Sequence, residues 1–105
     1  MQKLKSTEKL NEIIKESFVH PQLIFKHSNR CSISAMAHSR MRPFEGRPAT
    51  YIIDVVADRS LSQEIARVFG VVHQSPQVLV IKDGKCVYDH SHMGISAPEV
   101  ERQLT

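Results

Sequence analysis

The sequence predicts an α/β domain with a four-stranded mixed sheet that is flanked by helices on both faces. Some segments carry apolar residues at helical spacing, others are short, β-branched and apolar throughout, and the two kinds alternate along the chain. Asp83-Gly84, between the last two apolar segments, predicts a tight hairpin and so an antiparallel edge. The length of 105 residues fits a single domain, and we expect it to span residues 1–105.

The first half of the chain supplies two helices and two strands. A first helix is predicted at residues 7–19, where Pro21 ends it. A strand at residues 22–26 and a helix at residues 31–41 follow. A loop rich in Pro and Gly then leads to a strand at residues 50–56, whose lack of alternation indicates burial on both faces.

The second half adds a helix, a hairpin and a last helix. The stretch Ser60-Leu61-Ser62-Gln63 is typical of a capping box, and Gly70 is the expected stop of that helix. Strands are predicted at residues 77–82 and 85–89, and Ser96 caps the last helix. The apolar positions expected to face the core are Leu10, Ile13, Ile14, Phe18, Ile33, Met36, Ala37, Met41, Leu61, Ile65, Val68, Phe69, Val100 and Leu104.

Cys31 follows the first predicted strand across a short polar turn and begins the second helix. The thiolate is the nucleophilic form of cysteine, and the amides at a helix start and nearby cations favour it. Ordinary cysteine has a pKa of about 8.5, whereas such positions bring it to roughly 3.5–7.5. Cys31 is therefore the candidate reactive residue of this chain.

The charge of the chain is concentrated around Cys31. The formal net charge is +3, yet residues 26–47 alone carry +4, from Lys26, Arg30, Arg40, Arg42 and Arg47 against Glu45. A positive electrostatic field from these residues would favour a thiolate and attract an anionic substrate. A basic helix face exposed to solvent would explain the same charges equally well. No basic stripe is interleaved with aromatic residues, and we expect no nucleic-acid partner.

The two cysteines are expected to be free thiols. No segment has the apolar run of a signal peptide or a membrane span, so we expect a cytoplasmic protein without a membrane partner. Structural disulfides are rare in a reducing cytosol. Cys86, on the predicted edge strand, fits a small buried hydrophobe better than a resolving partner of Cys31. His90 and His92 fall short of a closed metal site, and no metal is expected.

Several of these features are similar to thioredoxin-like proteins. A cysteine begins the helix after the first sheet strand, Ser75-Pro76 precedes the strand that enters the hairpin, and Gly94 precedes the last helix. More narrowly, the segments Lys26-His27-Ser28, Cys31-Ser32-Ile33-Ser34 and His73-Gln74-Ser75-Pro76-Gln77 resemble the YtxJ family, the monothiol bacilliredoxins.

The resemblance covers nearly the whole chain. It implies a thioredoxin fold, a cis Ser75–Pro76 bond facing the reactive cysteine, and a cytosolic bacterial protein that acts on protein thiols capped by bacillithiol. One departure is visible, because the family commonly has Thr-Cys-Pro-Ile-Ser where this chain has Arg30-Cys31-Ser32-Ile33-Ser34. The loss of that proline changes the helix start and bears on the strength of catalysis and on the choice of small thiol.

A dithiol motif needs a second cysteine three positions on, and that position is Ser34. Cys31 therefore cannot close a disulfide within its own motif, but a lone thiolate can attack a mixed disulfide. We expect Cys31 to attack the sulfur of the small thiol that caps a target protein and to take the cap. A second small thiol then regenerates Cys31, so bacillithiol is a co-substrate, S-thiolated proteins are the partners, and no tightly bound cofactor is expected.

The neighbours of Cys31 have two interpretations each. Ser34 either donates its hydroxyl to the thiolate or is an ordinary serine of a helix start. Arg30 either stabilises the thiolate and holds a carboxylate of the small thiol, or faces solvent. The further expected substrate-binding residues are Ser32, Ile33, Ser75 and Pro76, and the expected structural supports beneath the loop are His27 and Ser28.

Two other functions compete with the oxidoreductase. A monothiol iron–sulfur carrier would use Cys31 and a small thiol as ligands, but such proteins usually show Cys-Gly-Phe-Ser, and this chain has Cys-Ser-Ile-Ser. A non-catalytic thioredoxin-fold binding module would show an unshifted pKa at Cys31 and no reaction with small disulfides.

Overall fold

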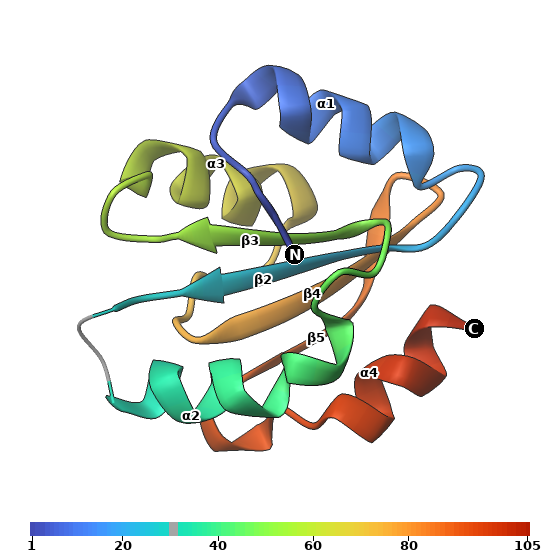
Figure 1. The fold of residues 1–105 in the computed structure, drawn as a ribbon. Coiled ribbons are helices and arrows are strands. Elements are labelled where there is room, and N and C mark those ends of the chain that lie inside the picture. Colours follow the sequence, from blue (N-terminus) through green and yellow to red (C-terminus); the bar gives the residue numbers. More distant parts are fainter. Residues whose placement is uncertain (30–31) are drawn as a thin grey trace.

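The computed structural model describes residues 1–29 and 32–105 and confirms the α/β architecture (Figure 1). A five-stranded sheet has the order β1-β3-β2-β4-β5. Its strands are β1 (Gln2–Lys3), β2 (Gln22–His27), β3 (Thr50–Asp54), β4 (Gln77–Lys82) and β5 (Lys85–Ser91). The helices are α1 (Thr7–Glu16), α2 (Ser32–Arg40), α3 (Arg59–Phe69) and α4 (Ala97–Leu104), with 3₁₀ turns η1 (Arg42–Phe44) and η2 (His92–Gly94).

The sequence predicted four strands, and the fifth is β1. Gln2 and Lys3 pair in parallel with β3. Two polar residues have neither the length nor the apolar run by which a strand is recognised in a sequence. Leu4 comes directly after them, is fully buried, and donates its N–H to the carbonyl of Ile52 at 2.8 Å. The burial of Leu4 therefore holds β1 at the edge of the sheet.

The strand directions bring two loops to one end of the sheet. β1, β3 and β2 run parallel, whereas β4 is antiparallel to both β2 and β5. Lys26, near the end of β2, pairs with Gln77 at the start of β4. The chain that leaves β2 and the chain that enters β4 therefore lie at the same end. All six residues of β2 are buried, as expected for a central strand covered on both faces.

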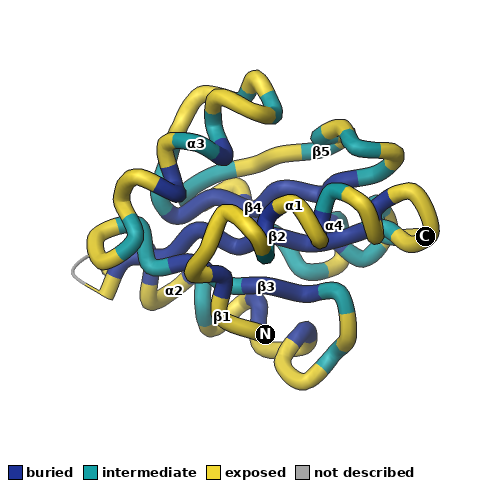
Figure 2. Tube along the Cα trace, turned by 90° about the horizontal axis from the view of Figure 1, so that it is seen from above, coloured by how far each residue is buried: buried dark blue, intermediate teal, exposed yellow. Residues whose placement is uncertain are grey.

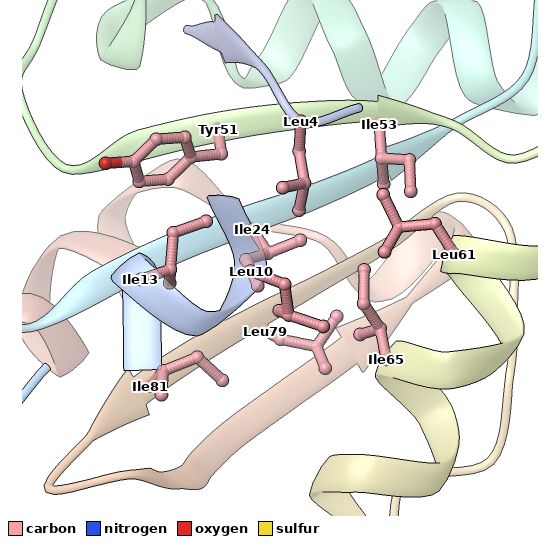
Figure 3. Close-up of a cluster of buried hydrophobic side chains, with 10 residues drawn as sticks. All are labelled: Leu4, Leu10, Ile13, Ile24, Tyr51, Ile53, Leu61, Ile65, Leu79 and Ile81. Carbon is pink, nitrogen blue, oxygen red and sulfur yellow. The ribbon is translucent and has the colours of Figure 1, made fainter. Parts of the chain in front are cut away.

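Helices cover both faces of the sheet. α1 and α3 lie on one face and α2 and α4 on the other (Figure 1). Between them β2, β3 and β4 are largely buried, whereas β1 and β5 are exposed or half-buried (Figure 2). The first core lies under α1 and α3 (Figure 3) and comprises Leu4, Leu10, Ile13, Ile24, Tyr51, Ile53, Leu61, Ile65, Leu79 and Ile81. The second, which includes residues of α2 and α4, comprises Leu23, Phe25, Ala37, Met41, Phe44, Val78, Val80, Ile95 and Val100.

α1 ends three residues earlier than predicted, because Ser17 turns toward the hairpin. The Ser17 hydroxyl accepts from the N–H of Gly84 at 2.9 Å, and the Ser17 carbonyl accepts from the N–H of Asp83 at 2.9 Å. Phe18 and Val19 then lie outside the helix and are 62% and 71% exposed. The backbone at Asp83 and Gly84 has φ of +51° and +76°, which confirms the predicted tight turn.

Other details of the helices were predicted with mixed success. The capping box at Ser60 is wrong, because the N-cap of α3 is Asp58, two residues earlier. The left-handed Gly70 does end α3, and Ser96 caps α4 by accepting from the N–H of Glu99 at 3.5 Å. Met36 and Val68 are exposed rather than buried.

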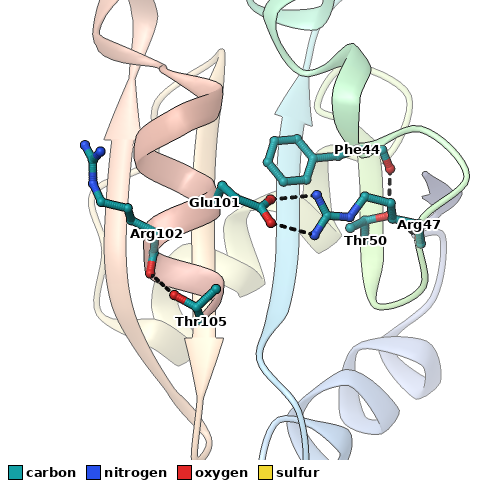
Figure 4. Close-up of polar contacts among 6 residues, drawn as sticks. All are labelled: Phe44, Arg47, Thr50, Glu101, Arg102 and Thr105. Atoms are coloured by element: carbon teal, nitrogen blue, oxygen red, sulfur yellow. Dashed lines mark hydrogen bonds and ion pairs between the residues drawn. The ribbon is translucent and has the colours of Figure 1, made fainter.

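The loop before β3 anchors α4 (Figure 4). The Arg47 guanidinium forms two hydrogen bonds with the Glu101 carboxylate, at 2.6 and 3.2 Å, and lies 4.9 Å from the centre of the Phe44 ring. The Thr50 hydroxyl donates to the Arg47 carbonyl at 2.6 Å. These contacts tie the end of the chain to the central strands.

Candidate functional site

The candidate site lies where β2 leads into α2, beside the loop that enters β4. Cys31 and Arg30, which the sequence analysis places at its centre, lie outside the described residues, so the site is built here from its surroundings. The Ser75–Pro76 peptide bond is cis, as the resemblance implied. The Pro76 carbonyl accepts from the N–H of His92 at 3.0 Å, which joins this loop to η2.

Ser34 is fully buried in the first turn of α2. Its hydroxyl oxygen accepts from the backbone N–H of Ser28, with 3.3 Å between the two atoms. The contact links the chain before Cys31 to the helix after it. Ser32 is exposed and Ile33 is half-buried at the start of α2, and their binding of substrate stays a prediction. A hydroxyl donation from Ser34 to the thiolate stays a prediction.

His27 packs beneath the site at the end of β2. Its side chain is 8% exposed, and its ring centre lies 5.7 Å from that of Phe25 and 4.8 Å from that of His38. Its Nε2 lies 2.8 Å from Oδ1 of Asn29, whereas its Nδ1 has no hydrogen-bond partner among the described residues. These contacts are those of a packing residue, and a role of His27 in supporting the active loop stays a prediction.

A cavity of about 610 Å³ lies beside the start of α2. It is lined by Ser28, Asn29, His38, Arg42 and Glu45, among others. Glu45 is held by the amino group of Met1 at 2.9 Å and lies 3.5 Å from Nε2 of His38. The hydrogen bond from the Met1 amino group, together with the contact with His38, holds the pKa of Glu45 below its usual value. The carboxylate is therefore already paired, and Arg42 remains to attract an anion.

Lys26 is the feature that sequence reasoning missed. Its side chain is fully buried, and its Nζ lies 3.2 Å from the Ser62 carbonyl and 3.1 Å from Nδ1 of His73. Burial lowers the pKa of Lys26 to about 8. The available signal was a lone lysine inside the apolar run Leu23-Ile24-Phe25-Lys26, which the sequence analysis counted only as part of a positive field.

Cys86 lies on β5 at the other end of the sheet. It pairs with Ile81, whereas Pro76 directly precedes Gln77 at the start of β4. Cys86 is half-buried, packs against the core under α1 and α3, and donates its thiol to the Tyr88 carbonyl at 3.3 Å. Burial raises the pKa of the Cys86 thiol to about 11. Its surroundings are those of a small hydrophobe rather than of a reactive thiol.

No three His, Cys, Asp or Glu side chains of residues 1–29 and 32–105 gather closely enough to hold a metal ion. Over the same residues, every helix is too short or too polar to cross a membrane.

Comparison with known proteins agrees with the fold and shows the family. The family model of the monothiol bacilliredoxin BrxC matches residues 2–100. A solved structure described as a thioredoxin fold with a proposed oxidoreductase role is similar at 30% identity and a TM-score of 0.85, covering 96% of this chain and 90% of that one.

Thioredoxins with lower identity share the fold. The thioredoxin of Malassezia sympodialis is 13% identical with a TM-score of 0.74 and coverage of 99% and 87% of the two chains. Mitochondrial thioredoxin 3 of Saccharomyces cerevisiae is 16% identical with a TM-score of 0.72 and coverage of 99% and 92%. The chain therefore has a thioredoxin fold and a thiol redox role, and it belongs to the monothiol bacilliredoxin BrxC family.

Proposed function

We propose that this protein is a monothiol thiol–disulfide oxidoreductase that removes bacillithiol, or a similar low-molecular-weight thiol, from mixed disulfides on proteins. The observation that carries the proposal is the pattern Cys31-x-x-Ser34 in a chain of the monothiol bacilliredoxin family. The position of a resolving cysteine is taken by a buried serine whose hydroxyl is engaged with the N–H of Ser28. Cys86 lies at the other end of β4.

The reaction consists of two thiol–disulfide exchanges. The Cys31 thiolate attacks the sulfur of the cap, the disulfide between cap and target breaks, and the target leaves as a thiolate. Cys31 then carries the cap as a mixed disulfide. A second small thiol attacks the sulfur of that cap, which releases Cys31 as a thiolate and forms the disulfide of two small thiols. No metal, flavin or external oxidant enters either step.

Binding of the small thiol is proposed on the side of α2 that holds the 610 Å³ cavity. Bacillithiol carries a malate group, and its carboxylates are matched by the always-charged guanidinium of Arg42. Arg30 belongs to the same positive stretch of sequence. The target segment is proposed to lie along Ser75 and Pro76, with the backbone of Ser75 hydrogen-bonded to an extended chain. Ser32 and Ile33, exposed and half-buried at the start of α2, complete this surface.

Intact-mass spectrometry after brief exposure to oxidised bacillithiol tests the proposal. We expect one bacillithiol adduct on the wild type and on Cys86→Ser, and none on Cys31→Ser. Oxidised glutathione, used in parallel, should react more slowly. Incubation of the adduct with a second small thiol should restore the free protein. An adduct that persists on Cys31→Ser, or the lack of any adduct on the wild type, would contradict the mechanism and favour a binding module.

A second assay tests the direction of transfer. A protein that carries bacillithiol on a single cysteine is mixed with the reduced wild type, and both masses are followed. The cap should leave the target and appear on the wild type in equal amounts, whereas Cys31→Ser should leave the target capped. Arg42→Gln tests the anion site, and we expect a several-fold slower transfer from bacillithiol with little change for cystamine, which carries no carboxylate.

A further inference from the structure

Lys26 is the one Lys, Arg, Asp or Glu among the described residues that is buried. Its ammonium donates to the Ser62 carbonyl of α3 and to Nδ1 of His73, at 3.2 and 3.1 Å. Its neighbours in the sheet, Ile53 and Gln77, are uncharged. No carboxylate of residues 1–29 and 32–105 lies within ion-pair distance of it. Lys26 is therefore a buried cation that no described group neutralises.

Both residues that accept from Lys26 line an open cavity of about 360 Å³. The hydroxyl of Ser62 and Nδ1 of His73 also lie 3.4 Å apart, so the two residues form one continuous part of its wall. The residues around this cavity are Val55, Val56, Arg59, Ser62, Gln63 and His73. The ammonium of Lys26 thus lies one hydrogen bond behind the cavity wall.

The cavity is electropositive, because none of its lining residues is acidic. Arg59 is exposed, and its guanidinium makes no ion pair with the part of the chain that the structure describes. The preceding Asp58 pairs with Lys5 at 3.3 Å. The pKa of His73 is lowered by burial and then by the charges of Lys26 and Arg59, so two cations act on the same ring of the wall.

The size and the remaining lining of the cavity suit an organic molecule better than a bare ion. A volume of about 360 Å³ falls within the range of small-molecule pockets, roughly 300–1,000 Å³. Val55 and Val56 supply apolar surface, and the amide of Gln63 supplies a hydrogen-bond donor. A guanidinium such as that of Arg59 binds a carboxylate through two parallel hydrogen bonds.

We propose that this cavity binds a small organic acid, whose carboxylate pairs with Arg59 and is attracted by the buried ammonium of Lys26, and whose carbon skeleton lies against Val55 and Val56. A buried charge is screened less by salt than a surface one, so the attraction persists at physiological ionic strength. The site shares no lining residue with the cavity beside α2 that the proposed function uses. It also does not depend on the reaction of Cys31.

NMR titration of the reduced, ¹⁵N-labelled protein with succinate tests the site. We expect saturable shifts of the backbone amides of Arg59, Ser62 and His73, and none with sodium chloride at the same ionic strength. Arg59→Gln should weaken the affinity for succinate by roughly fivefold, the effect of one ion pair near the surface. Arg67→Gln removes the same charge from the last turn of α3 and should leave the affinity unchanged. Inorganic phosphate, which has no apolar part, should bind more weakly than succinate.

The pH dependence of succinate binding tests the part of Lys26. Since its pKa is about 8, Lys26 loses most of its charge between pH 7 and pH 9. Over this range Arg59 stays charged, His73 stays neutral because its pKa is lowered from 6.5, and succinate stays ionised. We therefore expect the affinity of the wild type to fall several-fold from pH 7 to pH 9. A folded Lys26→Met should bind weakly at both pH values.

Three results would overturn the inference. These are equal affinities of wild type and Arg59→Gln, shifts that map to the cavity of Arg42 instead, and a wild-type affinity that does not change from pH 7 to pH 9. Phosphate binding as tight as that of succinate would also remove the organic acid as the ligand. A protein that binds succinate here but takes no bacillithiol adduct would keep this site and lose the proposed substrate, so the two proposals fail separately.

Discussion

The hydroxyl oxygen of Ser34 accepts a hydrogen bond from the backbone N–H of Ser28, with 3.3 Å between the two atoms. Ser28 precedes Cys31 and Ser34 follows it, so one contact joins the two flanks of the reactive position. Ser34 is fully buried and occupies the position at which a dithiol motif has its resolving cysteine. Its hydroxyl makes a structural hydrogen bond there. The contact links Ser28 to the first turn of α2 without a second sulfur.

Replacing Ser34 by Ala removes the hydroxyl oxygen that accepts from the Ser28 N–H. We expect the free energy of unfolding to fall by about 1 kcal/mol. If Ser34 also donates to the thiolate, the pKa of Cys31 rises and alkylation at pH 7 slows several-fold. Urea unfolding and the pH profile of alkylation measure the two effects. Ser39→Ala, at an exposed serine of α2, is the matched control, and a loss of stability with an unchanged pKa would assign Ser34 to structure alone.

His27 is expected to act by packing. Its ring packs against those of Phe25 and His38, which also contact each other, and its Nδ1 is buried without a hydrogen-bond partner among the described residues. His27→Phe removes that polar atom at similar volume, so we expect the free energy of unfolding to stay within about 1 kcal/mol of the wild type. The rate of bacillithiol adduct formation should stay within about twofold. A tenfold slower reaction in a folded variant would give His27 a part in the chemistry.

Most of the fold could be predicted from the sequence, because length, periodicity and turn chemistry can be read without knowledge of distant contacts. The hairpin at Asp83-Gly84 and the stop at Gly70 were predicted from residues that suit left-handed backbone. β1 was not, because its two polar residues are a strand only through pairing with β3. The early end of α1 also depends on a distant partner, since Ser17 binds the N–H groups of Asp83 and Gly84.

The site was predicted less completely than the fold. The cysteine, the proline and the serine of the motif are visible in a single sequence because their spacing carries the chemistry. The contact between Lys26 and His73 spans 47 positions and joins a strand to a loop, so no local pattern indicates it. A lysine inside an apolar strand signals that a partner exists, but its identity depends on tertiary structure.

Lys26 should make the protein more stable as the pH rises just above neutrality. Its pKa is about 8 in the folded protein and 10.5 for an ordinary lysine. Between these values the unfolded chain binds more protons than the folded one, so the free energy of unfolding increases with pH. From pH 7 to pH 9 we expect a gain of about 1 kcal/mol. Urea unfolding at pH 7, 8 and 9 measures it.

The gain in stability should be absent in Lys26→Met, since no other described group has a pKa that is lowered into the range between pH 7 and pH 9. Above pH 9 the gain is opposed, because the folded protein holds the protons of Cys86 and Tyr88, whose pKa values are raised by burial, longer than the unfolded chain does. A flat or falling profile of wild-type stability between pH 7 and pH 9 would show that Lys26 is not buried as a cation.

Cys86 should be nearly inert in the folded protein. Burial raises the pKa of its thiol to about 11 from an ordinary 9.0, so at pH 8 its thiolate fraction falls about a hundredfold. Iodoacetamide at pH 8, followed by peptide mass analysis of Cys31→Ser, should modify Cys86 about a hundredfold more slowly than in the same protein unfolded by urea. The folded and the unfolded protein are the same variant treated with the same reagent, so effects of the substitution and of the reagent cancel in the ratio of the two rates. Equal rates in the two states would show an exposed thiol and would return Cys86 to consideration as a second redox residue.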